Sequence, residues 1–510
     1  MGEGAWRVTV STMNSTRIFG LLLVLAGCPK SAPTPDLAQA NPDAGISEHQ
    51  IVAARVDALE QGAAQVVGAV DEALWKHWTT GAPIDLPAVT RGRETLFSKQ
   101  SLLTLRRARE LKAADPRRLS NLERWLGGEL LARGVAAESE ALSNLEASAT
   151  FTVDGKELAW RDLNKLLVSE KSAVKRRALW NGSHAAALRL DAAIVRRDEK
   201  VKEVLTALEL PAPLDFAAET RGLDLDALQK SAEDVLIRSD AEWKLTLQAL
   251  NDATVRLPAS ALTRGELPRL LKVPEVVDAE FPKARIATRA VQTLGTLGVY
   301  GQPGLTLDLA EAAKKNPLPL TVAPAPGDVR VSVKPVGGLR DQQAVLGELG
   351  AALTLKGAMS GSFASDRLGN PTDALRGSEL FASLVTEDVW LLANEVNNRA
   401  QVIAAARALR LFLLRRAAGV VLAKLQTQSL SDEAAARAKF VAIMSRATGI
   451  NMAPEEGARW RIETDDFLRS ASQLEAMISA AAWRENLGEG WWMKPLSPHS
   501  TGSGPAPLRQ

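Results

Sequence analysis

The chain has 510 residues, of which 46% are hydrophobic and 24% charged, so it can bury a large core. This composition excludes a disordered or collagen-like protein. Lysine and arginine number 62 against 60 aspartates and glutamates, and the two signs are interspersed along the chain. Without a basic face or arm, no nucleic-acid partner is expected.

The N-terminal region is typical of an export signal. Arg17 is followed by an apolar run from Ile18 to Val24 and then by Leu-Ala-Gly-Cys, which ends at Cys28. The apolar run is too short to span a bilayer as a mature helix, and small residues precede the cysteine. The stretch resembles the bacterial lipoprotein signal, in which the cysteine becomes the lipid-modified first residue. The alternatives are a short buried apolar helix or a wrongly assigned start, because Met13 is as plausible a start as Met1.

The predicted lipoprotein signal divides the N-terminus into two parts. Residues 1–27 are the signal peptide, and residues 28–45 are a Pro/Ala-rich, polar stretch that predicts a flexible tether. A lipid on Cys28 would anchor the protein to a membrane of the cell envelope, outside the cytoplasm. In a Gram-negative cell that membrane would be the outer membrane.

From residue 46 onward the apolar spacing is mainly helical. One helix is predicted around 117–134, with a capping box formed by Ser120 and Glu123 at its start. Another is predicted from Asp432 to Arg446, with acidic residues in its first turn and Gly449 just beyond its end.

Two segments break the helical pattern. Residues 150–158 alternate as a strand does and reach an Asp-Gly turn, which predicts a hairpin. Residues 328–338 alternate at Val329, Val331 and Val333 before Pro335, which predicts a short strand. The tail at 496–510 is predicted to be disordered.

The segment AVLGELGAAL, from Ala344 to Leu353, follows that strand and is close to a zinc-binding helix. Zinc peptidases of the H-E-x-x-H type place two histidines four residues apart, so that both reach one ion from one helix face. The adjacent glutamate is the general base for the metal-bound water. Here Gly347 and Ala351 stand at the two histidine positions, and Glu348 stands at the position of the base.

Further segments share this similarity, in one order along most of the chain after the tether. They are RGLDLDAL (221–228), the stretch from Lys314 to Gly338, LGELGAAL (346–353), RLGNP (367–371), LFASLVTEDVWL (380–391), FLRSASQLEAM (467–477) and GEGWW (488–492). Together they resemble the thimet oligopeptidase and oligoendopeptidase F family of zinc peptidases. The resemblance implies a mainly α, zincin-like fold, a two-lobed helical shell with a deep channel and a small β-sheet. We expect an N-terminal lobe at 46–210 and a C-terminal lobe at 211–495.

The resemblance also implies that the active site has been lost. The family's third zinc ligand, a glutamate, falls on Leu375 or Arg376, and a cation at Arg376 would repel zinc. The nearest acid is Glu379.

The residues that stabilise the transition state are also missing. The family uses tyrosines and a histidine on a late segment, where this chain has Arg469, Ser472 and Gln473, and its single tyrosine is Tyr300.

No other zinc site is expected. The four histidines, at 49, 77, 184 and 499, lack ligand-spaced partners, and Cys28 is assigned to the lipid. Zinc would be expected as a cofactor only if the family's site were intact. No phosphate loop or nucleophile turn is present in the sequence either.

The sequence therefore leads to a first hypothesis, a lipid-anchored and catalytically inactive pseudopeptidase that binds peptides or an envelope protein in its channel. Peptide pairing along an edge strand such as Val329 to Val333 would need no metal. The alternatives are an active metallopeptidase with an unrecognised site, or a structural envelope or assembly protein. Glu348 is then either a solvated or locally hydrogen-bonded carboxylate or a structural group, and Trp491 and Trp492 are expected to pack a terminal helix against the body.

Overall fold

The computed structural model describes residues 47–357, 361–464 and 467–495. The predicted signal peptide, the whole tether with Cys28, and the tail at 496–510 lie outside the described residues. Helices make up most of the described chain, with two small sheets, which confirms a mainly α fold with a small β-sheet. Among the described residues, no helix combines the length and apolarity needed to cross a membrane.

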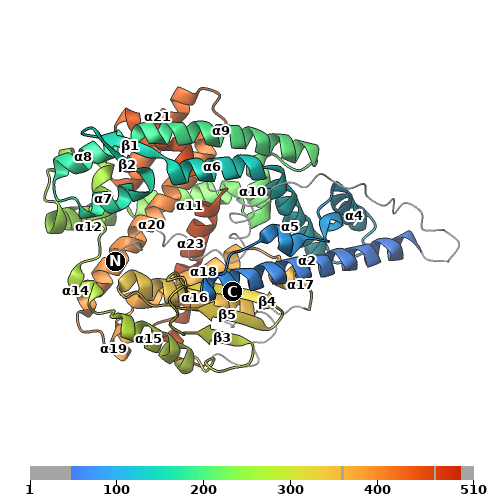
Figure 1. Cartoon of the computed structure of the whole chain (residues 1–510). Coiled ribbons are helices and arrows are strands. Elements are labelled where there is room, and N and C mark those ends of the chain that lie inside the picture. Colours follow the sequence, from blue (N-terminus) through green and yellow to red (C-terminus); the bar gives the residue numbers. More distant parts are fainter. Residues whose placement is uncertain (1–46, 358–360, 465–466, 496–510) are drawn as a thin grey trace.

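A three-stranded sheet lies between two long helices. Its strands are β3 (Leu305–Asp308), β4 (Leu320–Ala325) and β5 (Asp328–Ser332), in the order β3-β5-β4. Helix α2 (Glu48–Thr80) covers one face, where Leu320 and Val322 of β4 join its apolar side chains. Helix α16 (Leu339–Gly357) lies on the other face, where Val329 and Val331 of β5 join its core residues. Figure 1 shows this layer in the lower half of the molecule.

The predicted strand at 328–338 is confirmed over 328–332, but its expected place at an edge is wrong. β5 pairs in parallel with β3 and antiparallel with β4. Both of its backbone edges are therefore used within the sheet, and no peptide can add to this strand.

The predicted hairpin is confirmed as β1 (Thr150–Val153) and β2 (Lys156–Ala159). Its turn residues Asp154 and Gly155 both have positive φ, 49° and 73°, as a two-residue turn requires.

The predicted capping box at Ser120 is wrong. The helix, α5 (Pro116–Gly134), begins a turn earlier, where the Asp115 side chain accepts from the Arg118 N–H and Pro116 occupies the first turn. Ser120 therefore lies inside the helix, and Glu123 instead pairs with Arg109 at 2.5 Å.

The predicted helix at 432–446 is confirmed as α21 (Glu433–Thr448). The Asp432 side chain accepts from the Ala434 N–H, and Gly449 ends the helix in the left-handed conformation with φ 69°.

The long helices α20 (Arg399–Thr427) and α23 (Arg469–Leu487) lie between the sheet layer and the helices of the upper part (Figure 1). That upper part contains α6 (Ala136–Ser148) and α9 (His184–Ala207). α23 packs on α18 (Thr372–Ala382) and on α20. The remaining α-helices are α3 (Leu86–Thr90), α4 (Lys99–Glu110), α7 (Leu163–Ser169), α8 (Ala173–Gly182), α10 (Pro213–Arg221), α11 (Leu225–Arg238), α12 (Asp240–Thr254), α13 (Leu267–Leu270), α14 (Glu275–Asp278), α15 (Lys283–Thr296), α17 (Phe363–Arg367), α19 (Asp388–Ala393) and α22 (Trp460–Thr464).

The first helix of the predicted N-terminal lobe is tied to elements of the predicted C-terminal lobe. Asp71 of α2 is buried and accepts from the Ala323 N–H of β4 and from Arg367 of α17, each at 2.9 Å. The division near residue 210 and the channel between two lobes stay predictions.

Candidate functional site

The segments that carry the resemblance meet in space. α16 packs on α18, and α18 packs on α23. Arg221, at the end of α10, donates from Nε to the Phe467 carbonyl at 2.6 Å and from Nη1 to Ser472 Oγ of α23 at 3.4 Å. The next residue, Gly222, lies against Asn370 of the RLGNP segment. We call the positions Gly347, Glu348, Ala351 and Arg376 together the relic site, because the resemblance assigns the zinc-site residues to them.

The first histidine position of the relic site lies in a close helix contact, and the second is buried. A Cβ atom on Gly347 would stand 2.8 Å from Ser378 Oγ of α18. Ala351, one turn later, is 4% exposed. An imidazole needs several atoms beyond Cβ, so one at Gly347 would require Ser378 and the neighbouring part of α18 to move.

Glu348 is buried, with 1% of its surface exposed. This excludes the interpretation of its side chain as a solvated carboxylate. Its backbone carbonyl accepts from the Thr321 hydroxyl of β4 at 2.9 Å, which ties α16 to the sheet at this residue.

At the third-ligand position the structure has an ion pair. Arg376 donates from Nε to Glu475 of α23 at 3.1 Å and from Nη1 to Asp373 at 2.6 Å. Burial raises the pKa of the Asp373 carboxyl, and the Arg376 charge opposes that effect. Leu375, the other candidate position, is a buried apolar residue.

The acid nearest to that position is also engaged. Glu379 accepts from Arg410 Nη1 of α20 at 2.9 Å and from the Gln473 side-chain amide of α23. Positions 376 and 379 of α18 therefore face α23 and α20, while positions 377 and 378 face α16.

The late segment forms structural contacts as well. Ser472 is fully buried and accepts from Arg221, and Gln473 donates to Glu379. Tyr300 lies in the turn after α15 and is half exposed.

The side chains of the relic site do not fit a zinc ion. Two of the ligand positions offer no donor atom, and the third is a cation held by two carboxylates. Across the described ranges, no group of three or more His, Cys, Asp or Glu side chains is arranged to hold a metal.

The described histidines lie in two helices, α2 and α9. His77 of α2 has Nδ1 at 2.6 Å from the Ala82 carbonyl, while His49 is exposed near the start of the same helix. His184 packs on Trp180, and burial lowers its pKa to about 4.

The paired tryptophans pack as predicted. Trp491 and Trp492 are buried, and Trp491 meets Phe381 of α18 edge to face, with ring centroids 5.2 Å apart. Its Nε1 donates to Glu387 at 3.3 Å. Trp491 therefore holds the chain after α23 against α18, and burial leaves neither ring an exposed face for a ligand.

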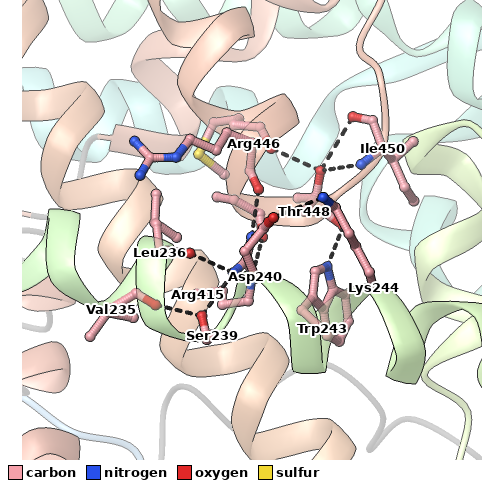
Figure 2. Close-up of polar contacts among 12 residues, drawn as sticks. Val235, Leu236, Ser239, Asp240, Trp243, Lys244, Arg415, Arg446, Thr448 and Ile450 are labelled. Atoms are coloured by element: carbon pink, nitrogen blue, oxygen red, sulfur yellow. Dashed lines mark hydrogen bonds and ion pairs between the residues drawn. The ribbon is translucent and has the colours of Figure 1, made fainter.

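Sequence reasoning missed a buried cation in α20. Arg415 is fully buried and donates to the Leu236, Arg446 and Ala447 carbonyls and to Ser239 Oγ, at 2.7 to 3.1 Å. Figure 2 shows it where α11 and α21 end, so one guanidinium satisfies carbonyls at the ends of two helices. The signal in the sequence is a pair of arginines inside the apolar stretch RLFLLRRAAGVV.

No protein-family model matches this chain, and no curated protein is significantly similar to it. The family resemblance therefore depends on the quoted segments alone.

Proposed function

We propose that the protein is a catalytically inactive relative of the thimet oligopeptidase and oligoendopeptidase F zinc peptidases, a pseudopeptidase. The observation that carries this proposal is the contact between α16 and α18 at the first histidine position, where Gly347 meets Ser378. The ion pair of Arg376 with Glu475 at the third-ligand position supports it. A bound water would have no metal to lower its pKa, so Glu348 alone would not activate it.

The location we propose is the cell envelope, with the folded part tethered through a lipid on Cys28. The support is the sequence from Arg17 to Cys28 and the polar stretch that follows it.

The residual activity we propose is peptide or protein binding in the retained shell. Because β5 is enclosed, an extended peptide would have to pair with an outer strand of the sheet. On β4 the Ala323 N–H already donates to Asp71. This favours β3, whose Thr306 is exposed, as the pairing strand.

The test is made on the purified chain with three measurements: zinc content, cleavage of a quenched peptide library with and without chelator, and titration with unstructured peptides. We expect no stoichiometric zinc, no chelator-sensitive cleavage, and peptide binding in the micromolar to millimolar range. The variant Glu348→Gln is the control, and it should leave any background cleavage unchanged.

Two outcomes would replace this function with one of its alternatives. Stoichiometric zinc with chelator-sensitive cleavage would show an active metallopeptidase. Absence of peptide binding, together with a stable protein partner in pull-downs, would show a structural envelope protein.

A further inference from the structure

Helices α16 and α18 touch through their backbones. A Cβ on Gly350 would stand 2.1 Å from the Gly377 carbonyl oxygen, and a Cβ on Gly377 would stand 2.7 Å from the Gly350 carbonyl oxygen. Real Cβ atoms do not approach other atoms so closely, so each glycine admits the other helix. Thr354 Oγ1 lies 2.2 Å from the same hypothetical Cβ of Gly377, while it donates to the Gly350 carbonyl at 2.9 Å.

The contact follows one stripe of α16. Gly347, Gly350 and Thr354 are spaced three and four residues apart and so share one helix face. Gly377 and Ser378 of α18 lie against that face. Ala351 belongs to the same stripe, so the stripe contains both positions where the resemblance places a zinc ligand.

The other side of α18 is held by charge. Arg376 pairs with Glu475 of α23, and Glu379 pairs with Arg410 of α20. These groups are partly buried, where ion pairs with good geometry hold better than at an open surface. In a zinc peptidase one metal ion would tie the zinc helix to the helix of the third ligand.

We propose that in this chain a direct helix lock has replaced the metal: glycine contacts join α16 to α18, and arginine pairs join α18 to α23 and α20. This inference rests on the proposed function and goes beyond it. It states that the loss of zinc cannot be reversed by restoring the two histidines, because α18 occupies the space in front of them.

The first experiment adds one methyl group at a time. By helix propensity alone, Gly350→Ala and Gly377→Ala should stabilise the protein. We expect both to lower the midpoint of thermal unfolding by several degrees, because each new Cβ overlaps a backbone carbonyl. Gly295→Ala is the matched control, because Gly295 is a helical glycine of α15 with no atom within 4 Å of its added Cβ. That control should keep or raise the midpoint.

The second experiment restores the ligands. The full-length variant Gly347→His/Ala351→His is dialysed to equilibrium against a fixed free zinc concentration and analysed for bound metal, and we expect no more zinc than in the wild type. The control Asp234→His/Arg238→His places the same pair, four residues apart, on exposed positions of α11. Because those imidazoles are accessible, the control should take up zinc and show that the assay detects a histidine pair.

The possible results separate the two proposals. If Gly350→Ala and Gly377→Ala unfold like Gly295→Ala, or if the double-histidine variant holds one zinc per chain at wild-type stability, the helix lock is wrong. If the double-histidine variant does not fold, the thermal unfolding of the two alanine variants still tests the helix lock. Zinc-dependent cleavage by the wild type would instead refute the proposed loss of activity.

Discussion

Glu129 offers a test of the core that depends on pH. It lies on α5, is 2% exposed, and burial raises its pKa from 4.5 to about 7. Arg133, one turn later, opposes the shift without cancelling it. The folded protein thus keeps a proton on this carboxyl over a pH range in which the unfolded chain releases it.

The sign and size of the effect follow from that difference. Between pH 4.5 and 7 the folded state binds more protons than the unfolded state, so the contribution of Glu129 to stability falls as pH rises. This stabilising contribution of Glu129 is fully present below pH 4.5. Above pH 7 about 3 kcal/mol has been lost, since each pKa unit corresponds to about 1.4 kcal/mol.

The assay compares the wild type with Glu129→Gln in denaturant titrations from pH 4.5 to 8. The amide has nearly the shape of the protonated acid and does not ionise. We expect the two proteins to be similar at pH 4.5, and the variant to become more stable than the wild type by up to about 3 kcal/mol above pH 7. Glu140→Gln is the control for replacing a glutamate by glutamine at an exposed position. A difference between Glu129→Gln and the wild type that stays constant with pH would refute the reasoning.

Three further predictions concern other parts of the chain. Arg415→Met should destabilise the protein by about 3–5 kcal/mol, because it removes the donor for carbonyls at two helix ends. In the same denaturant titration Arg407→Met, at an exposed position, should change the free energy of unfolding little. Arg376→Glu should destabilise the protein by about 2 kcal/mol or more, because the new carboxylate faces Glu475. In a double-mutant cycle the swapped pair Arg376→Glu/Glu475→Arg should recover part of that loss, whereas simple addition of the two single effects would contradict the ion pair. Cys28→Ala should release the protein from the membrane fraction and abolish incorporation of a labelled fatty acid, and unchanged membrane association would refute the lipid anchor.

Local signals in the sequence predicted those elements that depend on neighbouring residues. The Asp154-Gly155 turn and the caps at Asp432 and Gly449 set a hairpin and a helix end without distant partners. The start of α5 was misplaced because Asp115-Pro116 competes with Ser120 for the same role, and the earlier pair forms the cap.

Features that depend on distant partners could not be read in the same way. The alternation of Val329 and Val331 predicts a strand, but only the pairing with β3 and β4 makes it the central one. Nothing in the sequence around Gly350 and Gly377 indicates that glycine is needed there, because the need arises only where the two helices cross. The resemblance picks out positions such as Gly347 and Arg376, but the contacts that these positions make with α18 and α23 depend on the fold and could not be predicted from the sequence.

Helix α18 indicates why the replacements that we propose at the relic site would depend on one another. Its Gly377 and Ser378 allow α16 to approach, and that approach would be blocked by an imidazole at Gly347. In the pseudopeptidase that we propose, no divalent cation opposes an arginine at position 376, and Arg376 pairs with Glu475 and Asp373. Each replacement thus makes reversal of the other more costly. If this coupling is correct, restoring an acid at 376 in the double-histidine background should destabilise the protein further without recovering zinc.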